Sequence, residues 1–142
     1  MRVLLDTDVM VAAFRSSTGA SRQLLHAALD RKFVMLLSVP LVAEYEAVLT
    51  RAPHLLAAGV DADEVRVVLD ALCACAEAVR LAFLWRPLLK DPDDDMVLET
   101  AVNGMADLLV TFNLVDLQPA ARRFTIDVVS PGDALKTLRR KL

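Results

Sequence analysis

Short apolar runs alternate with longer segments of helical character along the chain. Four runs rich in leucine, valine and isoleucine are typical of buried strands, at residues 2–5, 33–38, 107–112 and 125–130. Amphipathic or capped segments predict helices at residues 20–31, 40–51, 61–75, 90–106 and 131–142. Strands separated by helices imply a parallel sheet with helices on both faces. We therefore expect one α/β domain over residues 1–142.

Polar side chains follow three of the predicted strands at the points where the strands end. In sheets of this kind, ligands bind beyond the carboxyl ends of the strands. We expect the following side chains to lie near that edge: Asp6, Thr7, Asp8, Ser38, Glu44, Thr111 and Asn113.

Composition narrows the class of protein. Of the 142 residues, 56% are hydrophobic and 25% are charged, which excludes a disordered polymer. No apolar run reaches the roughly 18 residues of a membrane helix, and Asp6 and Asp8 interrupt the first apolar stretch, which argues against a leader. The sequence predicts a soluble, cytoplasmic protein. The net charge of −3 gives no nucleic-acid signature, so an anionic substrate needs a local feature or a bound cation.

Cysteine and histidine offer little chemistry. Cys73 and Cys75 lie two apart in a predicted helix, where they point in different directions, and this fits a reducing compartment. His26 and His54 have no cysteine or second histidine at ligand spacing, so we expect no zinc site.

Asp6 and Asp8 need an explanation, because burying an ionised carboxylate without a partner is costly. Asp6 directly follows a buried strand and can cap a helix that begins near Val9, or it can serve a site at the sheet edge. Asp8 fits an N-cap or a loop position better.

Glu44 lies on the helix that follows Pro40, at the edge of its apolar stripe, whereas Glu46 points well away from that stripe. The stripe consists of Leu41, Tyr45, Val48 and Leu49. A half-buried Glu44 is therefore the more informative of the two acids, although a solvated flank remains open.

The segment "DPDDD" at residues 91–95 opens a helix, with Asp91 as N-cap and Pro92 at the first position. Capping and the helix dipole explain Asp91 and Asp93. They explain Asp94 less well, because it projects onto the face defined by Val97, Leu98, Ala101 and Met105. An EF-hand is excluded by spacing, since Met96 stands where that loop needs glycine and Val102 where it needs glutamate.

Asp6, Glu44 and Asp94 come from separate segments, yet each can point at the same sheet edge. Such a cluster repels itself and raises carboxylate pKa values unless a cation is present. Hard oxygen ligands with open positions suit Mg²⁺ or Mn²⁺. Ions of this kind support phosphodiester hydrolysis by activating water and binding the scissile phosphate.

These residues resemble a known family. The stretches "LLDTDVMVAAFRSSTGAS", "LLSVPLVAEYEAVLTR", "DPDDDMVLETA" and "ADLLVTFNLVDL" occur in the order and approximate spacing of PIN-domain proteins. The resemblance runs from Arg2 to about Leu138 and is strongest to the toxin components of bacterial toxin–antitoxin pairs. It implies a Rossmann-like three-layer fold with a central parallel sheet of four to five strands, and a Mg²⁺- or Mn²⁺-dependent ribonuclease similar to VapC-type toxins.

By the same resemblance, the family's acids fall on Asp6, Glu44 and Asp94, and its hydroxyl residues on Thr7 and Thr111. Two positions depart from the family pattern. Asp8 replaces the usual asparagine, and we expect it to act as a hydrogen-bonding or capping support. Asn113 replaces the usual fourth acid; it can offer a neutral carbonyl ligand, and Asp116 lies close enough to substitute as a metal ligand.

The resemblance also implies partners: an RNA substrate, a cognate antitoxin and a second copy of the chain in a homodimer. Arg15, after the first motif, is a candidate for phosphate contact. Arg139, Arg140 and Lys141 are better explained as partners of a helix dipole than as RNA ligands.

Two other function classes remain open. "DTDV" also resembles the start of haloacid-dehalogenase-type phosphatases, in which Asp6 would be the nucleophile and Asp8 an acid/base. That fold is larger than this chain, and it gives Glu44 no role. The third possibility is a PIN-like module that binds RNA or a partner and has lost catalysis with its fourth acid.

Overall fold

The computed structural model describes residues 1–82 and 92–141. Five parallel strands form one sheet in the order β3-β2-β1-β4-β5. In chain order they are β1 Arg2–Leu5, β2 Val34–Leu37, β3 Glu77–Ala78, β4 Leu108–Val110 and β5 Asp127–Val129. β1 lies at the centre and pairs with β4 through Leu5 and Val110, so the two strands end side by side.

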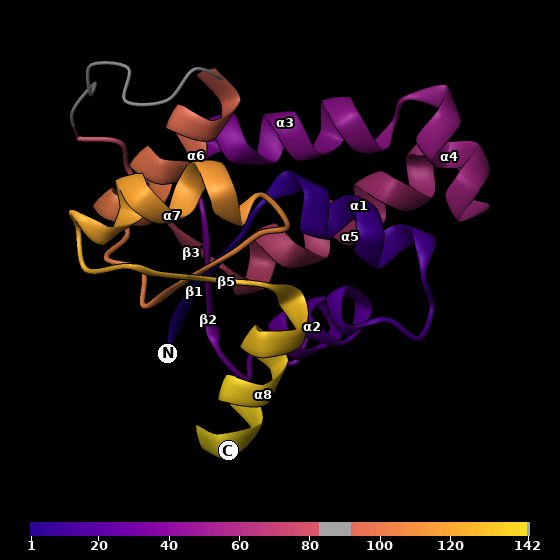
Figure 1. Ribbon diagram of the computed structural model, residues 1–142. Coiled ribbons are helices and arrows are strands. Elements are labelled where there is room, and N and C mark those ends of the chain that lie inside the picture. The colour runs from indigo at the N-terminus through magenta and orange to yellow at the C-terminus, as the bar shows by residue number, and fades with distance from the viewer. Residues whose placement is uncertain (83–91, 142) are drawn as a thin grey trace.

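Helices connect the strands and cover the sheet (Figure 1). They are α1 Thr7–Arg15, α2 Ala20–Leu29, α3 Val39–Leu49, α4 Ala52–Ala58, α5 Ala62–Cys75, α6 Pro92–Asn103, α7 Leu114–Arg122 and α8 Pro131–Lys141. Figure 1 shows α3, α6 and α7 together at the top of the view, whereas α2 and α8 lie lower, toward the end where the chain begins. Within residues 1–82 and 92–141, no helix combines the length and apolar character needed to cross a membrane.

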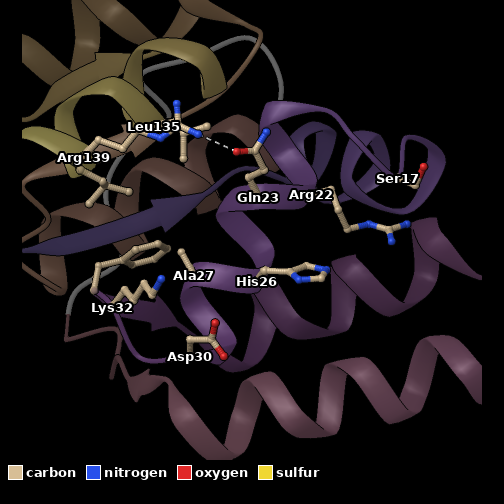
Figure 2. Close-up of a pocket in the computed structure, with 11 residues that line it drawn as sticks. Ser17, Arg22, Gln23, His26, Ala27, Asp30, Lys32, Leu135 and Arg139 are labelled. Atoms are coloured by element: carbon tan, nitrogen blue, oxygen red, sulfur yellow. Dashed lines mark hydrogen bonds between the residues drawn. The ribbon is translucent and has the colours of Figure 1, made fainter. Parts of the chain in front are cut away.

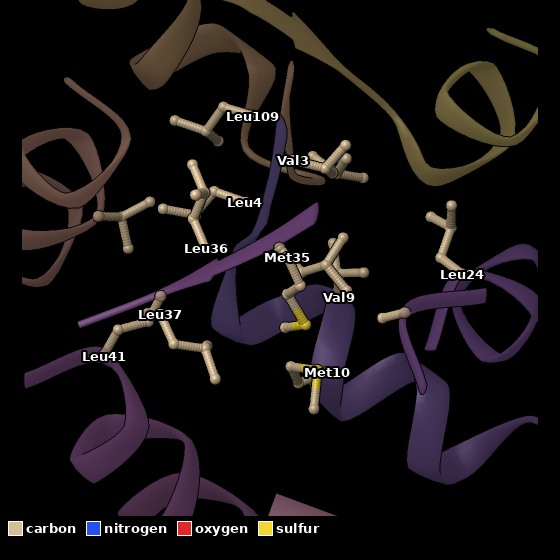
Figure 3. Close-up of a cluster of buried hydrophobic side chains, with 14 of the residues drawn as sticks. Val3, Leu4, Val9, Met10, Leu24, Met35, Leu36, Leu37, Leu41 and Leu109 are labelled. Atoms are coloured by element: carbon tan, nitrogen blue, oxygen red, sulfur yellow. The ribbon is translucent and has the colours of Figure 1, made fainter. Parts of the chain in front are cut away.

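The core is built from the strands, whose consecutive residues are buried on both faces of the sheet. Val3, Leu4 and Leu5 are all inaccessible to solvent. Figure 3 shows Val3 and Met35 on one side of the strands, and Leu4 and Leu36 on the other. Such continuous burial explains why these strands are uninterrupted apolar runs and do not alternate with polar residues. The parallel α/β sheet predicted from the sequence is confirmed.

Several local expectations need correction. The first helix begins at Thr7, two residues earlier than expected, because Asp6 caps it. Strand β3 and helix α7 were not predicted: β3 is two exposed residues long, and α7 contains Pro119. The predicted capping pair Asp61 and Glu64 forms a full capping box at the start of α5. Asp91, the predicted N-cap of α6, lies outside the described residues.

Candidate active site

Asp6 occupies the point where β1 turns into α1, and its environment follows from that position. Its backbone N–H donates to the Val110 carbonyl at 2.9 Å. Its Oδ1 accepts from the Thr7 backbone N–H at 2.7 Å, which caps α1, and its Oδ2 accepts from the Thr111 hydroxyl at 2.8 Å. Only 7% of Asp6 is exposed. The carboxylate is therefore both a helix cap and a fixed group at the carboxyl edge of the sheet.

Glu44 reaches the same edge from α3. The Thr7 hydroxyl donates to Glu44 Oε2 at 2.6 Å, which joins the first turn of α1 to α3. The next residue, Tyr45, is fully buried and donates its hydroxyl hydrogen bond to the Leu5 carbonyl at the end of β1. This anchor fixes α3 against the strand and so sets the position of Glu44.

Asp8 lies in the first turn of α1 and faces the loop after β4. Its Oδ2 accepts from the Phe112 backbone N–H at 3.1 Å and has a longer contact of 3.4 Å with the Thr111 hydroxyl. Its Oδ1 is buried and has no hydrogen-bond partner among the described residues. Asp8 therefore holds the β4–α7 loop, as expected of a hydrogen-bonding support, while Asp6 and not Asp8 caps the helix.

The first turn of α6 brings two further acids. The Asn113 side-chain amide donates to Asp94 Oδ2 at 3.1 Å, so the predicted inward-facing aspartate meets the loop after β4. The Asp93 carboxyl lies close enough to Glu44 to raise the pKa of Glu44. Sequence reasoning gave Asp93 only a capping role and missed this contact, because it depends on how α6 packs against α3.

The acids perturb one another. The pKa of Glu44 is raised from 4.5 to about 7, chiefly by burial and then by the negative charges of Asp93 and Asp6, while the Thr7 hydrogen bond opposes the shift. Burial also raises the pKa of Asp8, and the Asp94 charge adds to that effect. Burial, followed by the charges of Asp6 and Glu44, holds the pKa of Tyr45 well above its usual value.

The donor set fits a hard divalent cation by its chemistry. All the groups are oxygen donors, Asp8 Oδ1 is buried without a partner, and Glu44 holds its proton to about pH 7. In the described part of the chain, however, no three Asp, Glu, His or Cys side chains are grouped to hold one ion as they stand. Each acid instead accepts a hydrogen bond from a neutral side chain: Asp6 from Thr111, Glu44 from Thr7, and Asp94 from Asn113.

Two predicted residues lie apart from this cluster. Asp116 is exposed in the first turn of α7, and none of the hydrogen bonds of the described residues joins it to the acids. Arg15 lies in the last turn of α1, at the opposite end of that helix from Asp6, and its guanidinium contacts His54 Nδ1 at 2.7 Å. Metal ligation by Asp116 and phosphate contact by Arg15 stay predictions.

A cleft of about 290 Å³ between α2 and α8 is lined by several basic side chains (Figure 2). Arg22, His26, Lys32 and Arg139 line this α2–α8 cleft together with Asp30. Lys32 precedes β2, so the cleft lies toward the amino ends of the strands, away from the acids. None of the predicted site residues lines it.

The protein is an α/β protein with a parallel sheet, and its oxygen-bearing side chains gather at the carboxyl edge, where ligands bind in such sheets. Residues 2–114 match the sequence profile of the PIN domain, and the chain belongs to the PIN domain family.

Comparison with solved structures agrees on the fold. A complex of VapBC2 from Rickettsia felis, bound to a DNA fragment from its promoter, contains a chain that is 14% identical to this one. The match covers 92% of this chain and 98% of that one, with a TM-score of 0.58. No curated protein matches the sequence.

Proposed function

We propose that this chain is a VapC-like toxin that hydrolyses RNA phosphodiester bonds with the help of Mg²⁺ or Mn²⁺. Membership of the PIN domain family supports a nuclease, and PIN domains generally use divalent metal ions. The observation that carries the proposal is that Thr7 bonds both Asp6 and Glu44, while Asn113 bonds Asp94 at the same sheet edge, where ligands bind.

Asp6, Glu44 and Asp94 would hold the ion, with Asn113 or Asp116 as a further oxygen donor. The ion would lower the pKa of a water molecule for attack on phosphorus and stabilise charge on the phosphate. The chain's own residues orient the acids: Thr111 fixes one oxygen of Asp6, and Thr7 fixes one oxygen of Glu44. Such outer hydrogen bonds hold ligating carboxylates in position.

The phosphatase alternative gives no role to Glu44, which the Thr7 hydroxyl joins to the acidic edge. Membership of the PIN domain family also favours the nuclease.

We further propose a cognate antitoxin and a homodimer as partners. The similar chain from Rickettsia felis belongs to a VapBC complex, which supports an antitoxin partner. An RNA substrate is inferred from the family and the acidic site together, because a bound cation reconciles an acidic protein with a polyanion.

The test is an RNA cleavage assay in Mg²⁺ or Mn²⁺, and in EDTA. Asp6→Asn and Asp94→Asn each remove one charge, and Asn is as good an N-cap as Asp, so α1 keeps its cap. We expect at least about a 100-fold loss of cleavage in each variant, since metal ligands contribute several kcal/mol to catalysis. Asp30→Asn, which removes an exposed acid from the α2–α8 cleft, is the matched control.

Cleavage that survives both substitutions, or that persists in EDTA, contradicts the proposal. RNA binding without cleavage in any metal would instead identify a non-catalytic PIN-like module.

A further inference from the structure

Phe112 is the single exposed aromatic side chain within residues 1–82 and 92–141. It is 56% exposed, whereas Phe14, Phe33 and Tyr45 are buried in the core and Phe124 packs against it. Aromatic rings are normally placed where their large apolar surface is covered. At 56% exposed, more than half of the Phe112 side chain is left uncovered by the fold.

Phe112 and both of its neighbours in the chain are hydrogen-bonded to the acidic site. The Phe112 N–H donates to Asp8 Oδ2 at 3.1 Å, and the side chain of Asn113 donates to Asp94 Oδ2 at the same distance. The residue before it, Thr111, donates to Asp6. The backbone that carries the ring is therefore fixed beside the acidic site by the same carboxylates that define it.

In the described segment from β4 to the end of α7, two large apolar side chains are exposed, Phe112 and Val115, the latter at 85%. A stable protein interface needs many more such residues. A single flat ring is, in contrast, enough to stack on one nucleobase, and every base offers a π face.

We propose that Phe112 stacks on an unpaired base beside the phosphate held at the acidic site and so positions the RNA strand. The inference rests on the proposed ribonuclease function. A base lies one sugar away from its own phosphate, so a strand bound at the acids brings a base to the rim. Bases inside a duplex are already stacked on their neighbours and cannot reach the ring.

The first experiment measures binding of a fluorescein-labelled oligoadenylate of about 12 nucleotides, a length that a small site covers. Fluorescence anisotropy is recorded with Ca²⁺ in place of Mg²⁺, and gels check that the strand stays intact. Two further probes are a strand of equal length built from abasic ribose, and the oligoadenylate paired with oligouridylate.

We expect Phe112→Ala to weaken binding of the oligoadenylate at least about fivefold, the loss typical of one base stack. Binding of the abasic strand and the duplex should not change. Phe112→Trp should restore the preference for bases. Val115→Ala and Leu56→Ala truncate side chains that are 85% and 86% exposed, and both should stay within about twofold of the wild type.

Phe112→Trp also provides a direct signal. The wild-type chain already has one tryptophan, which also fluoresces. Subtracting the wild-type emission from that of Phe112→Trp therefore leaves the signal of the tryptophan at position 112. Oligoadenylate should quench that difference and the abasic strand should not. In cleavage assays, Phe112→Ala should raise KM and leave kcat nearly unchanged, whereas loss of an acid lowers kcat.

The outcomes separate this inference from the proposed function. If the wild type cleaves RNA, but wild type and Phe112→Ala both bind the oligoadenylate and the abasic strand equally well, the stacking is overturned. The proposed nuclease function then still stands. Quenching by bases without any cleavage overturns the nuclease and leaves the stacking standing. Failure to bind any of the RNA probes overturns the stacking. The stacking is also overturned if Phe112→Ala and Val115→Ala self-associate more weakly than the wild type while their RNA affinity is unchanged. That result would identify a protein-docking surface.

Discussion

The acidic edge and the α2–α8 cleft both concentrate charged side chains, but they are organised differently. At the edge, hydrogen bonds join residues far apart in sequence, as when Thr111 donates to Asp6 and Thr7 donates to Glu44. In the cleft, Arg22 donates to the carbonyls of Ala13 and Phe14, and Arg139 of α8 donates to Gln23 of α2. The hydrogen bonds at the edge are accepted by carboxylates, whereas these bonds in the cleft are donated by cations to neutral oxygens.

Convergence, and not the number of charges, distinguishes the two regions. Figure 2 shows the Arg22 guanidinium and the Lys32 amine on opposite sides of the cleft, with His26 between them, and Arg139 turned to Gln23. Spread cations of this kind do not form a pocket for one anion. At the edge, burial and then the negative charges of Asp93 and Asp6 raise the pKa of Glu44 to about 7, and such a perturbed carboxyl is typical of a functional site.

The largest expected effect compares two acids on one helix. Glu44→Gln removes a carboxylate that meets Thr7 and Asp93, whereas Glu46→Gln removes an exposed one paired with Arg66. We expect at least about a 100-fold loss of RNA cleavage for Glu44→Gln and less than about a twofold change for Glu46→Gln. Equal losses in the two variants would contradict a role that depends on convergence.

A second expected effect is a pH dependence of stability. Unfolded Glu44 loses its proton near 4.5, but in the folded protein its pKa is about 7. The folded state therefore holds more protons between these values, and the stability of metal-free protein should fall as pH rises from about 4.5 to about 7. The raised pKa of Asp8 acts in the same direction.

Thermal melts in EDTA across this range measure the slope, and Glu44→Gln should flatten it. Metal ligation needs the ionised carboxylate, so the increase in melting temperature with Mg²⁺ should grow from about pH 6 to about pH 8. An increase that is equal at both pH values would mean that Glu44 is not a ligand.

The fold followed from sequence wherever one strong pattern determined an element. The apolar runs of β1, β2 and β4 are buried on both faces, and the capping box at Asp61 is local, so both were predictable. β3 was not, because its two exposed residues pair only with β2. α7 was obscured by the proline at its centre.

The site residues were likewise predictable where one helix determined them, and not where two packed elements did. Helical periodicity suggested Glu44 over Glu46, because it measures which side of one helix faces the core. It could not find the contact of Asp93 with Glu44, which depends on the separation and rotation of two packed helices. Nor could it find the exposed ring of Phe112, since an apolar residue ending a strand run is ordinarily expected to be buried.

Asn113→Asp sharpens the comparison by adding one charge to the edge. The substitution removes the amide donor to Asp94 and puts a second carboxylate beside it. We expect metal-free protein to lose about 1–2 kcal/mol of stability, from the lost hydrogen bond and the added repulsion. Mg²⁺ should then raise the melting temperature more than in the wild type.

If the native site is degenerate, Asn113→Asp creates cleavage that the wild type lacks. A variant that is as stable as the wild type in EDTA and gains nothing from Mg²⁺ would contradict a shared cation site at Asp94 and Asn113.

The smallest effects are expected in the α2–α8 cleft. Arg22→Ala removes donors to the last carbonyls of α1 and should cost about 1 kcal/mol of stability, whereas Lys32→Ala, at an exposed position, should stay within about 0.5 kcal/mol. Urea unfolding measures both. Neither variant should change RNA affinity or cleavage, because the cations do not converge on one anion. If Lys32→Ala loses RNA affinity at unchanged stability, the cleft is a second RNA-binding surface. Dispersed cations would then contribute to RNA binding as well as the converging acids.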